Sequence, residues 1–131
     1  MTTQPKLTRN QSLVFETLEK AGQPLSAYTI LDQLRGAGLR APLQVYRALE
    51  KLLEAGLVHR LESINSFVAC AHPHPHAHGS AFAICERCGR VDEFSDKMVE
   101  ARLREWSSEH GFRPSHTTIE IRGECATCAS S

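Results

Sequence analysis

Residues 59–93 read HRLESINSFVACAHPHPHAHGSAFAICERCGRVDE, and the rest of the chain is organised around this stretch. It collects side chains that bind divalent metals: His59, Cys70, Glu93, the pair Cys85 and Cys88, and the tract His72, His74, His76 and His78. Two prolines within the tract remove backbone donors and favour extended backbone, so residues 71–80 are predicted to form a hinge. We expect metal bound in this stretch to select one arrangement of the segments on either side.

Upstream of this stretch, three segments have the apolar spacing of helices and end at glycines: residues 7–22, 26–38 and 41–56. In the third segment Pro42 suits the first helical position, and the apolar stripe consists of Val45, Leu49, Leu52 and Leu53. Residues 57–61 and 66–70 are typical of two short strands joined by a turn. The order predicts a winged helix-turn-helix domain over residues 1–70, although a small helical bundle with an added hairpin has the same pattern.

Downstream, residues 80–94 are typical of a strand, a tight C-x-x-C turn and a second strand. Residues 96–110 predict an amphipathic helix that Asp96 can cap, with Met98, Val99, Leu103 and Trp106 on its apolar face. A strand over residues 117–124 and a second C-x-x-C pair complete the chain. The overall fold class is therefore α/β (α+β), with a small αβ domain over residues 81–131.

Composition limits the classes of function. The 131 residues carry 15 basic and 15 acidic side chains, and the slight positive excess of residues 1–70 is too weak to indicate nucleic acid by itself. No apolar run could span a membrane and no signal peptide is evident, so we expect a cytoplasmic protein with reduced thiols. Five cysteines, four of them in C-x-x-C pairs, then favour metal binding over disulfides.

Cys85 and Cys88 are separated from Cys125 and Cys128 by 36 residues. Each C-x-x-C turn places two thiolates on one side, and two such turns complete a tetrahedral four-sulfur site that suits zinc. Four protein ligands leave no open position, so the predicted zinc is structural. The alternative is a redox dithiol, but the thioredoxin-like strand-to-helix setting of such a motif is absent.

A second ligand set is predicted around Cys70, which lies outside this quartet. Taken singly, Cys70 could be a buried thiol, His59 an exposed histidine, Glu93 a surface carboxylate and the histidine tract a solvated linker. Together they offer thiolate, imidazole and carboxylate ligands from both sides of the predicted hinge. This chemistry suits zinc, and the thiolate argues against magnesium, calcium or manganese.

The third predicted helix carries polar side chains on the faces that its apolar stripe leaves free: Gln44, Tyr46, Arg47 and Lys51. In a winged helix-turn-helix this helix enters the major groove, where arginine can bind guanine and tyrosine can contact a thymine methyl or a phosphate. Phosphate contacts are expected from Lys6, Arg9, Arg40 and Arg60. Alternatively, Tyr46 packs against the domain and Arg47 is a solvated charge.

The helix and wing VYRALEKLLEAGLVHRLES, the motif CERCGRVDEF and the closing GECATC resemble the ferric uptake regulator superfamily, from about Leu7 to Cys128. The resemblance implies an N-terminal winged-helix domain, a C-terminal αβ dimerisation domain, and a homodimer that represses transcription when metal is bound. The helix that contains Trp106 and the strand TTIEIRG resemble the dimerisation elements.

Within the superfamily the chain resembles the zinc uptake regulator branch. The resemblance implies that His59, Cys70, His78 and Glu93 bind a regulatory zinc, and that Tyr46 and Arg47 contact bases. Iron-type members carry an H-H-x-H cluster whose last position is Phe82 here, so that pattern, shared by peroxide sensors, is broken. A third site that uses His74, Glu100 or His116 is a weaker hypothesis.

The sequence therefore predicts a zinc-responsive repressor with two zinc ions per chain that binds a palindromic DNA operator as a homodimer. We expect no enzyme activity, no small-molecule substrate and no membrane partner. Three alternatives stay open: a regulator of the same fold that responds to iron, manganese or peroxide, a thiol oxidoreductase, and a zinc-binding module that does not bind DNA.

Overall fold

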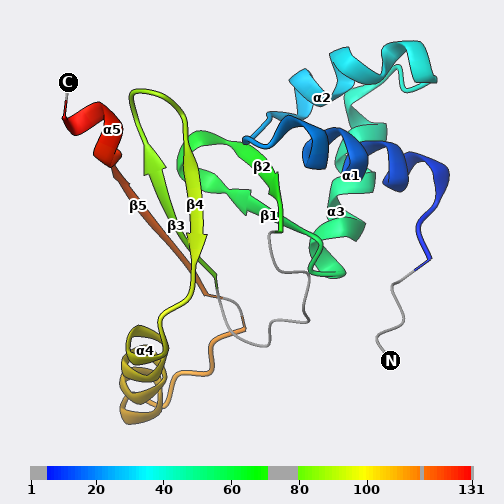
Figure 1. Cartoon of the computed structure of the whole chain (residues 1–131). Helices are drawn as coiled ribbons and strands as arrows, with labels where there is room; N and C mark the ends of the chain where they lie inside the picture. Colours follow the sequence, from blue (N-terminus) through cyan, green and yellow to red (C-terminus); the bar gives the residue numbers. More distant parts are fainter. Residues whose placement is uncertain (1–5, 71–79, 116, 131) are drawn as a thin grey trace. The chain divides into compact units, whose positions relative to one another are not determined.

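A computed structural model describes residues 6–70, 80–115 and 117–130 of the chain (Figure 1). The chain divides into two compact units, Met1–Pro75 and His76–Ser131. The predicted hinge lies outside the described residues apart from Ser80, and so do the four histidines of the tract and His116. The predicted boundaries at residues 70 and 81 therefore stay a prediction.

The first unit begins with three helices, α1 (Arg9–Ala21), α2 (Ala27–Leu34) and α3 (Pro42–Glu54). Their starts are set by local chemistry, because the hydroxyls of Thr8 and Ser26 accept the backbone N–H groups of Gln11 and Thr29 at 3.2 and 3.1 Å. The predicted helix over residues 26–38 is shorter than expected. It ends at Leu34 and continues as a 3₁₀ turn, η1 (Arg35–Ala37), before Gly38 adopts a φ of 105°.

The core of the first unit lies between these helices. Each helix contributes an apolar stripe at helical spacing, and the residues at its centre have almost no exposed surface: Val14, Leu18, Ile30, Leu31, Val45, Leu49 and Leu52. Three of the four stripe positions predicted for residues 41–56 are buried, and Leu53 packs partly buried against the cluster. Burial of this apolar surface is the main stabilising contribution to the unit.

The wing is a hairpin of β1 (Val58–Leu61) and β2 (Ser66–Ala69), joined through η2 (Glu62–Ile64). Asn65 completes the turn with a φ of 47°, a left-handed conformation that asparagine tolerates. Leu25 bridges to Phe67 through two backbone hydrogen bonds of 2.9 and 2.8 Å, so the hairpin is attached to the segment between α1 and α2. Phe67 is buried in the helical core. These contacts make the hairpin part of one folded unit and confirm the predicted winged helix-turn-helix.

The second unit is a three-stranded sheet with the order β4-β3-β5. β3 (Ser80–Cys85) pairs antiparallel with β4 (Val91–Phe94) and parallel with β5 (Thr118–Gly123). Helix α4 (Lys97–Glu109) connects β4 to β5, and Asp96 caps it by accepting the N–H groups of Met98 and Val99. A single helical turn, α5 (Ala126–Ala129), follows β5, where the sequence predicted only a C-x-x-C turn. The mixed αβ fold is otherwise as predicted.

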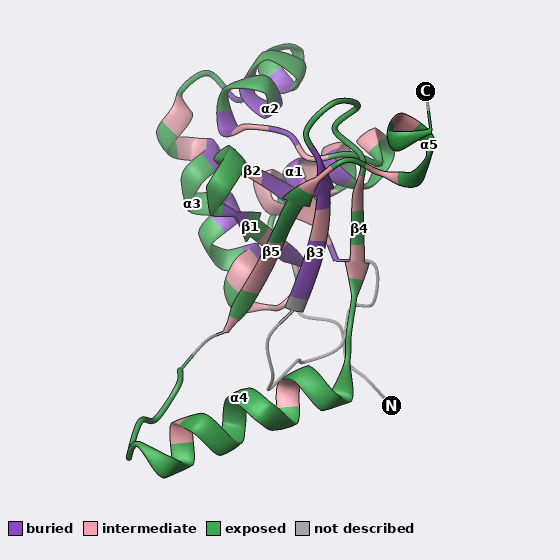
Figure 2. Cartoon of the chain, turned by 90° about the vertical axis from the view of Figure 1, so that its left-hand side faces the viewer, coloured by how far each residue is buried: buried purple, intermediate pink, exposed green. Residues whose placement is uncertain are grey.

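Helix α4 has the predicted apolar face, but the single chain does not bury it. None of the α4 residues is buried, and Figure 2 shows the helix almost entirely in the exposed class. Met98 is 83% exposed and Trp106 is 47% exposed. Trp106 stacks on His110 with ring centroids 4.2 Å apart, which orders the end of the helix without covering the face.

None of the helices in the described part of the chain is both long enough and apolar enough to cross a membrane.

Candidate metal centres and nucleic-acid interface

The pairing of β3 with β5 brings the two C-x-x-C pairs together. Cys85 is the last residue of β3 and stands in register with Gly123 at the end of β5, two residues before Cys125. Because the two strands are parallel, the segments that follow β3 and β5 leave the sheet at the same end. The backbone N–H of Glu86 extends this pairing by donating to the carbonyl of Gly123 at 2.8 Å. We call residues 85–88 and 125–128 the first and second knuckles.

The geometry of the four cysteines fits a tetrahedral metal. Their sulfur atoms all lie within 4.8 Å of one another, and Cys88 Sγ lies 3.7 Å from Cys125 Sγ. A Zn–S bond of about 2.3 Å in a tetrahedral site puts neighbouring sulfurs about 3.8 Å apart. None of the five cysteines of the chain forms a disulfide. The separation therefore suits coordination, and the four residues could hold a zinc ion with no open position.

Backbone N–H groups lower the pKa of two of the four cysteines and so favour the thiolate form that binds metal. The N–H groups of Cys88 and Cys125 both point at Cys85 Sγ at 3.4 Å, and they lower the pKa of Cys85 from 9.0 to about 6. The pKa of Cys125 is also lowered, chiefly by the backbone N–H of Cys128. In contrast, the neighbouring sulfur of Cys125 raises the pKa of Cys128 to about 12. Metal must therefore displace a proton from Cys128, and acidification opposes binding.

His59 and Cys70 form a second pair of metal-binding side chains within the first unit. His59 on β1 stands opposite Val68 on β2, and Cys70 comes two residues later, where its N–H donates to the Leu57 carbonyl at 2.8 Å. This register places His59 and Cys70 diagonally on the same face of the hairpin. A ring nitrogen of His59 and Cys70 Sγ lie within 4.8 Å of each other. Cys70 is buried and His59 is half-buried.

The other two residues predicted for this second site belong to the other side of the predicted hinge. Glu93 lies on β4 in the second unit, opposite Phe82 of β3, and is half-buried. His78 lies outside the described residues. The structure thus brings together half of the predicted ligand set, His59 and Cys70, and the joining of His78 and Glu93 to them stays a prediction.

The outward face of α3 carries the side chains predicted to contact DNA. Tyr46, Arg47 and Lys51 are exposed, and Lys51 forms an ion pair with Glu54 at 3.4 Å. Gln44 has a structural role as well, because its Oε1 accepts the N–H groups of Arg40 and Ala41 at 2.8 and 3.1 Å and so caps the helix. The predicted DNA contact of Gln44 would have to use its amide nitrogen.

Two further residues of the first unit differ from what the sequence led us to expect. Leu43, one turn before Arg47, is 57% exposed, although helical periodicity alone would not distinguish it from a core leucine. Arg9, which we expected to contact phosphate, donates from Nη2 to the Ala37 carbonyl at 2.8 Å and so ties the start of α1 to η1. A long-range contact of this kind leaves no signal in the local sequence.

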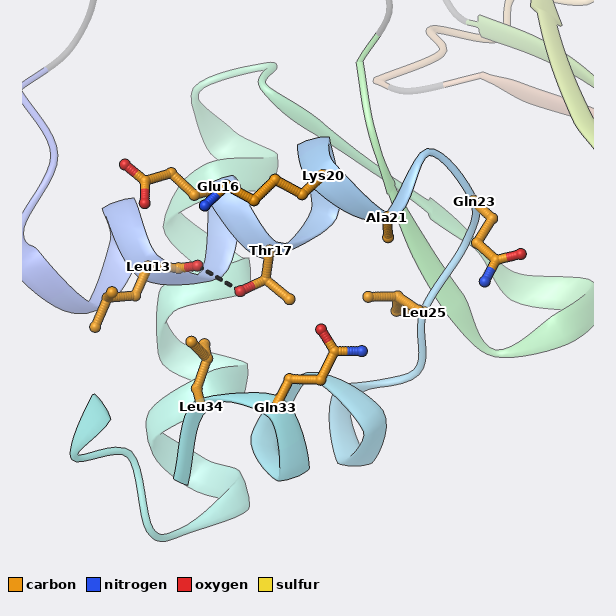
Figure 3. A pocket seen from close by; sticks show the side chains of 9 residues that line it. All are labelled: Leu13, Glu16, Thr17, Lys20, Ala21, Gln23, Leu25, Gln33 and Leu34. Carbon is orange, nitrogen blue, oxygen red and sulfur yellow. Dashed lines mark hydrogen bonds between the residues drawn. The ribbon is translucent and has the colours of Figure 1, made fainter. Parts of the chain in front are cut away.

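A hollow between α1 and α2 has a volume of about 380 Å³ (Figure 3). Its wall includes Glu16, Lys20 and Gln33 beside the apolar Leu13 and Leu34. The Thr17 hydroxyl there donates to the Leu13 carbonyl at 2.8 Å, within α1. The lining contains neither cysteine nor histidine, and we assign it no metal-binding or catalytic role.

The chain is similar to proteins named for the regulation of zinc uptake and of ferric uptake. It is 41% identical over 124 residues to the zinc uptake regulation protein of Escherichia coli (strain K12), a match that covers 94% of this chain and 72% of that protein. It is 34% identical over 125 residues to the ferric uptake regulation protein of the same strain, and this match covers 92% of this chain and 82% of that protein.

Two solved structures have the same fold. Holo XcZur is 42% identical with a TM-score of 0.88, and the match covers 96% of this chain and 88% of that one. A zinc uptake regulator complexed with zinc and DNA is 40% identical with a TM-score of 0.89, and the match covers 95% of this chain and 84% of that one.

The winged-helix unit and the αβ unit with its cysteine quartet define a metal-binding winged-helix protein. Residues 2–122 match the Ferric uptake regulator family, and the chain belongs to this family. The predicted resemblance to the zinc uptake regulator branch is confirmed by the relatives described above.

Proposed function

We propose that this chain is a zinc-responsive transcriptional repressor that binds operator DNA as a zinc-loaded homodimer and represses zinc-uptake genes. The observation that carries the proposal is the pair His59 and Cys70 on one face of the wing, because a thiolate beside an imidazole favours zinc over harder metals. The similarity to the E. coli zinc uptake regulation protein supports the same assignment.

Two zinc ions per chain have different roles in this proposal. The quartet of Cys85, Cys88, Cys125 and Cys128 holds a structural zinc. The regulatory zinc is bound by His59, Cys70, His78 and Glu93, which come from both sides of residues 71–80. Such a site forms fully only in one arrangement of the two units, so zinc selects that arrangement.

The energies involved are sufficient for a switch. Shifting a two-state equilibrium from almost fully open to almost fully closed takes about 5.5 kcal/mol of differential binding. Structural zinc sites in model peptides reach about 10–16 kcal/mol, so even a considerably weaker site could drive the change. At low free zinc the regulatory site is empty and affinity for the operator is poor.

The dimer presents two recognition helices to the two halves of a palindrome. The exposed apolar face of α4 supports homodimer formation, because large apolar patches on a single chain mark interaction sites. In each subunit Tyr46 and Arg47 contact bases, and Gln44 and Lys51, about one turn before and after Arg47 on α3, also contact the DNA. We infer from this role that the protein works in the cytoplasm and is not an enzyme.

The test is zinc-dependent DNA binding by the full-length wild type and by Cys70→Ser, with DNA selected from a random pool by the zinc-loaded protein. Allosteric coupling commonly changes affinity by about 5- to 150-fold, and we expect a zinc-dependent gain of this size that Cys70→Ser abolishes. Ala69→Ser is the matched control, since it adds a hydroxyl at the neighbouring residue and leaves the thiol intact. A Cys70→Ser protein that keeps the zinc-dependent gain would refute the proposal.

The alternative regulators are tested in the same assay by replacing zinc with iron(II) or manganese(II), or by adding peroxide. A larger response to one of these than to zinc would favour a regulator of that signal. A thiol oxidoreductase would have Cys85 and Cys88 reactive in the zinc-loaded protein, whereas bound thiolates should resist alkylation.

A further inference from the structure

Two ion pairs connect the first knuckle to the residues that lead into the second knuckle. Arg122 Nη2 donates to Glu86 Oε2 at 3.2 Å, and Arg87 Nη1 lies 3.7 Å from Glu124 Oε2. In the first knuckle the acidic Glu86 precedes the basic Arg87 in the sequence. Before the second knuckle the basic Arg122 precedes the acidic Glu124. Both pairs form in the same register that brings the four sulfurs together.

Arg87 reaches further into the second knuckle than the other three residues. Its Nη1 also donates to the carbonyl of Cys128 at 3.1 Å, and Cys128 supplies one of the four sulfurs. Helix α5, which carries Cys128, contains no buried residue, so apolar packing contributes little to its position. Arg87 thus contacts a segment that apolar packing does little to hold in place.

We propose that Arg87 is a positioning residue of the four-cysteine site: it holds the second knuckle against the first and thereby slows zinc release. The proposal rests on zinc occupying the quartet, as proposed above. If the quartet holds zinc, a Cys128 thiolate kept near the other three sulfurs would rebind more often than one free to move away. By keeping Cys128 close to the ion, Arg87 favours recombination over escape.

The expected effect is kinetic and modest. Arg87 and Glu124 are 57% and 50% exposed, so solvent screens their attraction. The hydrogen bond to the Cys128 carbonyl comes from a charged donor and adds to it. Loss of both contacts should accelerate zinc release by about 3- to 10-fold.

Zinc release is measured in the full-length Cys70→Ser background, so that the quartet is the zinc site observed. Zinc-loaded protein is mixed with excess chelating indicator, and the rate of zinc release is compared between the parent protein and its Arg87→Ala variant. Arg90→Ala is the matched control. It removes the same charge two residues after Cys88, but the Arg90 guanidinium pairs locally with Asp92 at 3.1 Å.

We expect Arg87→Ala to release zinc about 3- to 10-fold faster and Arg90→Ala to stay within about twofold of the parent. The cobalt(II)-loaded variants should keep the absorption of a four-thiolate site, which shows that the ligands are unchanged. Glu124→Ala should reproduce part of the acceleration, and adding it to Arg87→Ala should have little further effect.

Equal release rates for Arg87→Ala and the parent would overturn the proposal. Equal acceleration by Arg87→Ala and Arg90→Ala would overturn it too, because the effect would then come from the loss of a positive charge and not from the contacts of Arg87. If Arg87→Ala misfolds, Arg87→Gln keeps a donor for the Cys128 carbonyl and should release zinc at an intermediate rate; a parental rate there would also overturn it. A parent protein that retains no zinc would instead refute the structural zinc of the proposed function.

Discussion

The two units of the chain are stabilised in different ways. In the first unit three helices and the wing surround a continuous apolar cluster that includes Val14, Ile30, Leu49, Leu52 and Phe67. In the second unit the buried residues among those described all lie on β3, namely Ala81, Phe82, Ile84 and Cys85. Helix α4 buries none of its residues. A small unit with so little core needs a metal or a partner subunit.

This difference separates the roles of the two metal sites. The quartet lies wholly in the core-poor unit at the ends of β3 and β5, and we expect that unit to need metal at the quartet in order to fold. His59 and Cys70 lie on a wing that the apolar core already holds in place. We therefore expect metal to bind to that pair and dissociate from it without unfolding the wing, as the proposed sensor requires.

The largest effect is expected from complete removal of metal with a strong chelator. Thiolate zinc sites contribute up to about 10–16 kcal/mol in small domains, so β3, β4 and β5 should lose their protection from amide hydrogen exchange. Helices α1 to α3 should keep theirs, because they are held by apolar burial. Cys125→Ser should have the same effect without chelator. Full protection of β3 and β5 in metal-free protein would remove the distinction between the units.

Leu52→Ala tests the other half of the comparison. Leu52 has no exposed surface, and its truncation should cost the first unit about 2–5 kcal/mol of unfolding free energy. The zinc content of the quartet should stay the same. The unfolding free energy is measured by calorimetry of zinc-loaded Leu52→Ala, with Leu43→Ala at an exposed position as control. The comparison separates the effect of truncating a buried leucine from that of truncating an exposed one. Equal costs for the two variants would contradict the assigned core.

Arg47→Ala should weaken binding of the zinc-loaded dimer to its selected DNA by about 1–3 kcal/mol and relax discrimination at one G·C position. Arg35→Ala removes the same charge from the same unit, but Arg35 is already paired with Asp32 at 3.1 Å. Quantitative binding to single-base variants of the selected DNA gives both values. If the two variants lose affinity equally for all sequences, Arg47 contacts only the phosphate backbone.

The smallest effect comes from the helix caps, and it depends on metal in one unit only. Ser26→Ala in the first unit and Asp96→Ala in the second should each cost about 0.5–2 kcal/mol, because each side chain caps a helix by accepting backbone N–H groups. The Ser26 cost should be visible in thermal melts with and without zinc. The Asp96 cost should appear only with zinc bound, since the metal-free second unit is expected to be unfolded already.

Local chemistry explains what the sequence could predict. Ser26, Pro42 and Asp96 begin their helices because capping and the fixed φ of proline act within one turn. The periods of the apolar residues likewise predicted three helices followed by a hairpin. The quartet was predictable because C-x-x-C fixes two ligands within one knuckle, whatever the rest of the chain does.

Contacts between distant segments were not predictable. The bridge from Leu25 to Phe67, the hydrogen bond from Arg9 to Ala37 and the reach of Arg87 to Cys128 join residues that no local pattern relates. The cap formed by Gln44 was missed for a different reason, because a side chain that reaches backward over its own helix start resembles an ordinary exposed glutamine. The predicted regulatory site draws on residues from both units, and its ligand set stays a prediction.

The most direct test of the central claim is zinc stoichiometry per chain, measured by elemental analysis after dialysis against a moderate chelator and again after zinc is restored. We expect one tightly held zinc per chain that rises to two, with the increment lost in Cys70→Ser. A value that stays at one in both states, in wild type and variant alike, would contradict it and leave the cysteine quartet as the sole zinc site.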